Sequence, residues 1–270
     1  MSFQPIVPVG GIAGWAFLRQ TRDAQENAFS ASAPVSRATE YFAERIGDVR
    51  SAADLVSDRR LLSVALGAFG LDADIDSGFF VRKVLEEGTS SEEALSNRLA
   101  DKRYLALSEA FGFGDIPGGN AARPGFAEDL VRQYTERQFE AAIGRSNPDM
   151  RLVLGLEREL ADLAGRSLSN DGQWYTVMGT PPLRAVFEKA LGFPASIGTL
   201  DVDRQLDLFK ARAEERLGSS QIGVLASPEG REAITRRFLA VSEIAGGASP
   251  TTRGSAALAM LTSTPILPMT

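Results

Sequence analysis

The chain has 270 residues, of which 44% are hydrophobic and 24% are charged, and these fractions are typical of a globular protein with a sizeable core. Its formal net charge is −6, so electrostatic attraction to nucleic acid or to an anionic membrane is not expected. The sequence contains neither cysteine nor histidine, which excludes disulfides, thiolate metal sites and imidazole acid–base chemistry within these residues.

Residues 1–34 are predicted to form an N-terminal arm. Its first 14 residues are rich in proline and glycine and lack the basic start and unbroken apolar run of a signal peptide. A helix with loosely helical spacing is expected from Trp15 to about Phe29. Because no predicted element anchors this arm, Trp15, Phe17 and Leu18 are candidate contacts with a partner protein.

Residues 35–245 show the apolar spacing of successive amphipathic helices, which predicts an all-α, multi-helix bundle. Gly114–Gly125 is the clearest break and is predicted to link two halves, about 35–113 and 126–245. Residues 246–270 are rich in Gly, Ser, Thr, Ala and Pro and are expected to form a flexible C-terminal tail. No run approaches the roughly 18 apolar residues of a membrane span.

One helical motif recurs along the chain. Asp58–Leu71 has near copies at Asp101–Phe113 and Thr180–Phe193, each ending in an apolar residue, glycine and another apolar residue. Gly70 and Gly192 stand where a left-handed residue is expected to close a helix. Because the first and third copies align without gaps, the two halves of the bundle are predicted to be pseudo-repeats.

Few residues suggest chemistry. Asp72, Asp74 and Asp76 resemble the start of a calcium loop, but Ser77 occupies the position of the turn glycine and Lys83 that of the bidentate glutamate. A solvated loop whose last aspartate caps the next helix is the favoured interpretation, and ion binding stays open. In Leu156–Leu160 charges of both signs sit between apolar residues, which is typical of a solvated helix face. No catalytic, cofactor-binding or metal-binding residue is predicted.

Several segments carry a resemblance to a known family. They include Tyr41-Phe42, Asp58-Arg59-Arg60-Leu61-Leu62, Leu99–Tyr104, Arg137-Gln138-Phe139-Glu140 and Trp174–Gly179 followed by Pro181-Pro182. From Tyr41 to about Ile244 the chain resembles helical proteins of undefined role encoded among flagellar genes of alphaproteobacteria. The resemblance implies involvement in the flagellum and supplies no catalytic residues.

These observations favour a non-enzymatic structural or accessory protein of the flagellum that acts through protein–protein contacts. The expected partners are flagellar proteins, with no nucleic acid, no membrane insertion and no cofactor. The expected location is the cytoplasm or the flagellum. A cytoplasmic chaperone or adaptor for an exported flagellar protein is the alternative. An enzyme using carboxylates or a bound metal is a third hypothesis, which would require a polar pocket with converging acidic groups.

Overall fold

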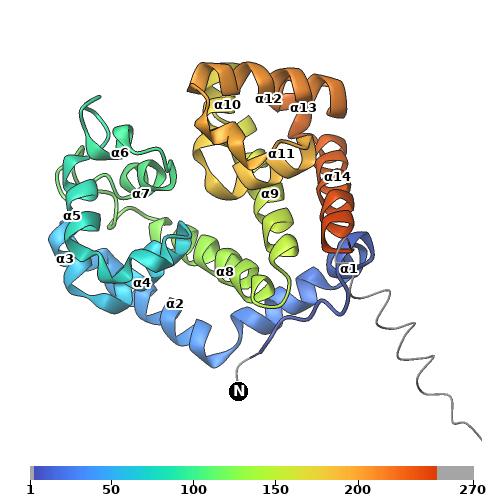
Figure 1. Cartoon of the computed structure of the whole chain (residues 1–270). Helices are drawn as coiled ribbons and strands as arrows, with labels where there is room; N and C mark the ends of the chain where they lie inside the picture. The colour runs from blue at the N-terminus through green and yellow to red at the C-terminus, as the bar shows by residue number, and fades with distance from the viewer. Residues whose placement is uncertain (1–2, 248–270) are drawn as a thin grey trace, which may run out of the picture.

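The computed structural model describes residues 3–247. These residues form fourteen α-helices and three short 3₁₀ helices and contain no strand, which confirms the predicted all-α bundle (Figure 1). The helices gather into two lobes, each with its own apolar core. Among residues 3–247, no helix combines the length and the apolarity needed to cross a membrane.

The first lobe is built from residues 33–125 and from the start of α8. Its α-helices are α2 (Ala33–Arg45), α3 (Ala52–Ser57), α4 (Arg59–Ala68), α5 (Gly78–Glu87), α6 (Leu95–Arg98) and α7 (Arg103–Phe111), with the 3₁₀ helices η1 (Ile46–Asp48) and η2 (Asp72–Asp76). The central element is α4, in which Leu61, Leu62 and Leu66 are buried together with the small residues between them. This wide apolar stripe lets α4 contact α2, α3 and α8 at once.

The second lobe contains the N-terminal helix and the second half of the chain. Its elements are α1 (Gly11–Ser30), α9 (Pro148–Ala164), α10 (Asn170–Gly179), α11 (Pro181–Leu191), η3 (Ala195–Thr199), α12 (Val202–Leu217), α13 (Ile222–Leu225) and α14 (Pro228–Gly247). Trp174 is fully buried here, and its ring meets Phe187 and Phe209 edge-on.

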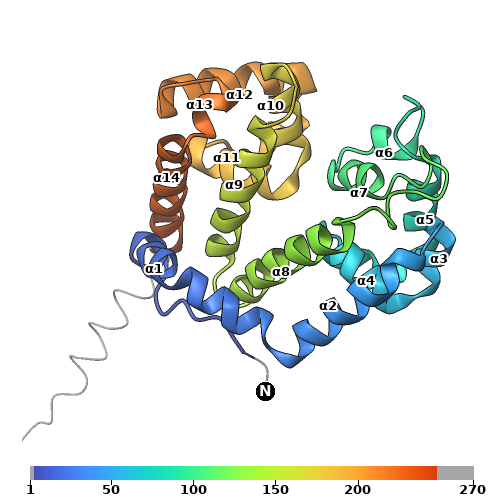
Figure 2. The same ribbon diagram turned by 180° about the vertical axis from the view of Figure 1, so that it is seen from behind.

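The long helix α8 (Phe126–Gly144) joins the two lobes (Figures 1 and 2). Its first half contributes Phe126 and Leu130 to the core of the first lobe, and its second half contributes Phe139 and Ile143 to the core of the second. Tyr134, halfway along, packs against both cores. The two lobes therefore share one continuous helix.

The division of the chain differs from the sequence-based prediction at its N-terminus. A helix was expected between Trp15 and Phe29, and α1 covers that range. The predicted arm does not stand apart from the bundle, however, because α1 packs on α14, α8 and α9 and contributes Trp15, Leu18 and Phe29 to the second core. These three helices come much later in the chain, as in the contact of Phe29 with Phe139, so local spacing could not indicate them.

The predicted linker, 114–125, is an integral loop of the first lobe. The Asp115 carboxylate accepts hydrogen bonds from the backbone and hydroxyl groups of Thr89 and Ser90, at 2.7–3.0 Å. The Asn120 backbone N–H donates to the carbonyl of Phe111, and Ala121 is buried. The boundary between the lobes falls inside α8 instead. The predicted C-terminal tail, 246–270, lies outside the described residues apart from 246 and 247, which end α14.

The recurring helix endings have the predicted local geometry. Gly70 and Gly192 have φ of +68° and +69°, and in each case the following apolar residue donates its backbone N–H to a carbonyl five residues earlier. Gly112, which follows α7, is also left-handed, with φ +63°. The predicted duplication of the two halves is not confirmed. What the three copies share is the local geometry of a helix end with a left-handed glycine.

Candidate functional site at the lobe junction

The acidic loop does not gather its carboxylates around one point. Asp72 accepts from Gln138 Nε2 at 2.6 Å, and Asp74 accepts from the Tyr104 hydroxyl at 2.8 Å. Asp76 pairs with Arg59 at 2.8 Å. From the sequence, Asp76 was expected to cap the next helix, but its side chain makes no capping hydrogen bond to α5. Within residues 3–247, no cluster of three or more acidic residues is arranged to hold a metal ion.

The candidate partner contacts are divided between the core and the surface. Trp15 and Leu18 are only 2% and 0% exposed, so these two side chains belong to this protein's own core. Phe17 is 36% exposed on the outer face of α1. A partner contact on α1 therefore stays a prediction for Phe17 alone.

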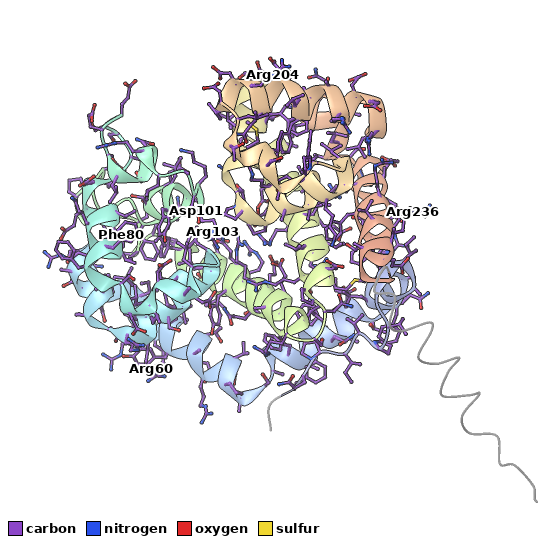
Figure 3. All side chains as sticks on the ribbon, viewed as in Figure 1. Arg60, Phe80, Asp101, Arg103, Arg204 and Arg236 are labelled. Carbon is purple, nitrogen blue, oxygen red and sulfur yellow. The ribbon has the colours of Figure 1, made fainter. Side chains whose placement is uncertain are left out.

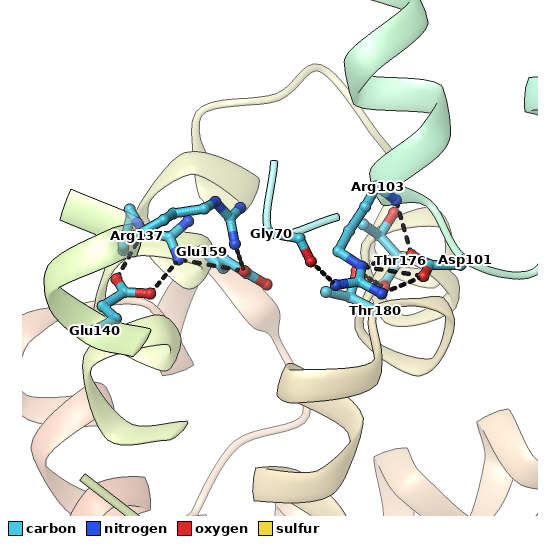
Figure 4. A network of polar contacts seen from close by, with 9 residues as sticks. Gly70, Asp101, Arg103, Arg137, Glu140, Glu159, Thr176 and Thr180 are labelled. Carbon is cyan, nitrogen blue, oxygen red and sulfur yellow. Dashed lines mark hydrogen bonds and ion pairs between the residues drawn. The ribbon is translucent and has the colours of Figure 1, made fainter. Parts of the chain in front are cut away.

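The densest polar arrangement lies where α8 passes α9, a region that sequence reasoning did not single out. Arg158 of α9 forms a bidentate ion pair with Glu140 of α8, with N–O distances of 3.0 and 2.9 Å. Arg137 of α8 donates to Glu159 of α9 at 3.2 Å, and Arg158 also approaches Glu159 at 3.4 Å. These four side chains are here called the junction cluster, and Figure 4 labels three of them, Arg137, Glu140 and Glu159.

The junction cluster is nearly buried. The side chains of Glu140, Glu159 and Arg158 are 8%, 10% and 14% exposed. Burial opposes the charge of Arg158, but the adjacent Glu140 outweighs burial and raises the pKa of Arg158. For Arg137, burial and the repulsion of Arg158 together lower the pKa. The ion pairs Arg158–Glu140 and Arg137–Glu159 hold α8 to α9.

Arg103, at the start of α7, extends the polar contacts from the first lobe. Its guanidinium pairs in a bidentate manner with Asp101, at 2.6–3.0 Å, and donates to the backbone carbonyl of Gly70. Figure 4 shows this side chain beside Thr176 and Thr180 of the second lobe. Next to it, the Lys102 backbone N–H donates to the carbonyl of Gly179 at 3.2 Å, which links the lobes directly.

Two cavities flank the junction cluster, and Arg103, Arg137, Arg158 and Glu159 line both. The larger one, here called the junction cavity, has a volume of about 420 Å³, and the smaller one about 90 Å³. The remaining walls of the junction cavity are Gly70, Glu140, Gly144, Pro148, Arg151, Leu152, Gly155, Pro181, Pro182 and Ala185. The junction cavity thus combines charged side chains with an apolar rim.

The sequence held one signal for this site that was interpreted otherwise. Leu156–Leu160 was expected to be a solvated face, yet Arg158 and Glu159 point into the junction with α8. That expectation was wrong because the helix facing these charges lies outside the local sequence. Three successive charges between two leucines of α9 were the available clue, since charged residues are buried only when paired.

Chemically, the junction is a set of paired ions beside a cavity. Both of its glutamates already accept hydrogen bonds from guanidinium groups, so each carboxylate is held by a neighbouring arginine. The arginines carry donors suited to carboxylate or phosphate groups. This arrangement is suited to holding an anion and to fastening α8 to α9.

The fold and the junction define a two-lobed, all-α protein in which the junction cluster and the junction cavity lie where α8 meets α9. The family model described as "Protein of unknown function (DUF1217)" matches residues 68–229, more than half of the chain. The protein therefore belongs to this family of unknown function, and the match includes the junction cluster.

A solved structure shares the fold. The X-ray crystal structure of an Agrobacterium tumefaciens protein, determined by a structural genomics consortium, is 26% identical in sequence and superposes with a TM-score of 0.72. The similarity covers 89% of this chain and 98% of that one. No curated protein matches the sequence.

Proposed function

We propose that this protein is a non-enzymatic accessory or structural component associated with the bacterial flagellum, and that it acts through protein–protein contacts. The flagellar part rests on the resemblance of residues 41–244 to proteins encoded among flagellar genes. The observation that supports a non-enzymatic role is the junction cluster, in which Glu140 and Glu159 are both neutralised by arginines. Paired in this way, the two glutamates hold α8 and α9 together.

Two exposed apolar regions are candidate contact surfaces. Ile12 and Phe17 lie exposed on α1. Leu200, two residues before α12, and Val202, its first residue, are exposed, and the hydroxyl of the exposed Tyr175 of α10 donates to the next residue, Asp203, at 2.6 Å. Exposed aromatic and aliphatic side chains of this kind commonly anchor protein interfaces.

Deletion of the gene in a flagellated alphaproteobacterium tests the proposal. We expect reduced spreading in soft agar and an altered number or length of filaments by electron microscopy, both restored by the wild-type gene. Complementation with Phe17→Ser or with Leu200→Ser/Val202→Ser identifies the surface in use, and Val224→Ser, another exposed aliphatic, serves as the matched control. Unchanged motility and unchanged filaments in the deletion strain would refute a flagellar role.

Localisation separates this proposal from the alternative of a chaperone or adaptor. A structural or accessory component should co-purify with basal bodies or filaments. A chaperone or adaptor should remain in the cytoplasm and bind one exported flagellar protein in stoichiometric amount. If the protein neither co-purifies with basal bodies or filaments nor binds an exported flagellar protein, both the structural role and the chaperone role are refuted.

A further inference from the structure

We propose that the junction cavity binds a small organic anion, with a carboxylate or phosphate group attached to an apolar body. The chain as a whole carries a net charge of −6, yet four guanidinium groups and only two carboxylates line this cavity. Its volume of about 420 Å³ falls within the usual range of ligand pockets. This inference does not depend on the flagellar role.

Arg151 supplies the charge that the protein does not neutralise. Arg137 and Arg158 are paired within the junction cluster, and Arg103 is paired with Asp101. Arg151 lies exposed at the cavity wall, and within residues 3–247 no carboxylate forms an ion pair with its guanidinium. A guanidinium with free donors beside an apolar wall is suited to bind a carboxylate or a phosphate group.

The side chain of Arg151 is placed by its packing on Gly144. A Cβ atom added to Gly144 would lie 2.5 Å from Cδ and 3.0 Å from Cβ of Arg151. The aliphatic stem of Arg151 therefore rests on the bare backbone at the end of α8. This packing fixes where the guanidinium meets the cavity.

Gly155 provides a second, independent indication of a ligand. It lies in the middle of α9, where glycine costs roughly 0.5–1 kcal/mol relative to alanine. A Cβ atom at this position would meet nothing closer than 3.9 Å, and the nearest atoms are Arg158 Nη2 and Glu140 Oε2. A methyl group would therefore fit here in ordinary van der Waals contact, so helix packing does not require glycine, and its missing side chain enlarges the junction cavity beside the ion pair. Space for a bound molecule accounts for the glycine.

The cavity wall matches the two parts of such a ligand. Pro148, Leu152, Pro181, Pro182 and Ala185 form an apolar rim that would cover a hydrocarbon or aromatic body. The anionic group would then lie toward Arg151, with the paired charges of the junction cluster behind it. A neutral apolar molecule would gain only the first of these contacts.

The test uses the full chain and the fluorescent probe 8-anilino-1-naphthalenesulfonate, an aromatic body with one anionic group. We expect one saturable site whose affinity falls at least tenfold in Arg151→Gln and in Gly155→Leu. Arg204→Gln, which removes an exposed guanidinium on the outer face of α12 (Figure 3), should bind as wild type. Octanoate and octyl phosphate should displace the probe, and their relative potency distinguishes the carboxylate from the phosphate group. Octan-1-ol, which lacks the charge, should displace it poorly.

Gly155→Ala keeps the test decisive if the leucine variant fails to fold. Because the site accommodates a methyl group, this variant should raise the melting temperature while weakening probe binding. Wild-type affinity in both Arg151→Gln and Gly155→Ala would overturn the proposal, as would displacement by octan-1-ol equal to that by octanoate.

Discussion

Removing one partner of the ion pair between Glu140 and Arg158 should lower the free energy of unfolding substantially. In Glu140→Gln the side chain keeps its shape, but Arg158 loses its bidentate carboxylate in a setting where it is only 14% exposed. Removing one member of a buried pair costs about 3–5 kcal/mol. Since Glu159 still lies 3.4 Å from Arg158, we expect the lower end, about 3 kcal/mol. For a chain of this size that corresponds to a fall in Tm of roughly 6–12 °C.

Urea denaturation followed by circular dichroism at 222 nm measures this cost. The matched control is Asp129→Asn, which breaks the pair of Asp129 with Arg132 on the same helix, where both side chains are more than half exposed. Its expected cost is less than about 1 kcal/mol. The double variant Glu140→Gln/Arg158→Met should recover much of the stability, because no charge is left buried without a partner. If Glu140→Gln is no more destabilising than Asp129→Asn, the junction cluster does not fasten the helices as argued.

Three further outcomes follow from single groups. Gly192→Ala should lower the free energy of unfolding, measured by urea denaturation, by about 1 kcal/mol, because φ of Gly192 is +69°. Gly223→Ala is the control, because Gly223 has no positive φ and open space around it, and it should cause no such loss. Equal effects of the two substitutions would contradict the left-handed cap at Gly192. Burial alone would raise the pKa of Asp115, but the hydrogen bonds that its carboxylate accepts from Ser90 and Thr89 outweigh burial and lower this pKa. The carboxylate therefore adds to the free energy of unfolding above about pH 4, and this contribution is lost as pH falls through the folded-state pKa. Asp115→Asn should flatten the acid limb of a stability–pH curve, and an unchanged limb would count against this role of Asp115. Burial and the hydrogen bond to Asp74 raise the pKa of Tyr104 to about 12; its contribution is complete below pH 10 and lost on the way to 12, so Tyr104→Phe should remove a late step from the absorbance titration at 295 nm.

Much of the local structure could be predicted from the sequence because helix boundaries depend on nearby residues. A capping residue followed by proline predicts a helix start at Asn147-Pro148, and α9 begins there, with the Asn147 side chain accepting from the backbone N–H of Met150 at 3.2 Å. The glycine ends at Gly70 and Gly192 are confirmed for the same reason. A capping side chain and a left-handed glycine act within one helical turn, so their signals are complete in a short window.

The Thr89–Glu92 segment shows where local signals fail. Its spacing matches a capping box, which predicts a helix running to about Leu99, yet only Leu95–Arg98 is helical. The hydroxyls and backbone N–H groups of Thr89 and Ser90 donate instead to Asp115, about 25 residues away. A distant carboxylate decided the conformation of this segment, and no local pattern identifies it.

The sequence by itself determined that this protein is helical and that several of its helices end at a left-handed glycine. Only the tertiary structure decided that α1 belongs to the second core and that the lobes divide inside α8. It also decided that Arg158 and Glu159, expected on a solvated face, are buried against Arg137 and Glu140. Helix formation follows from interactions over a few residues, whereas burial of a charge depends on a partner brought close by folding. The junction and its cavity therefore became visible only in three dimensions.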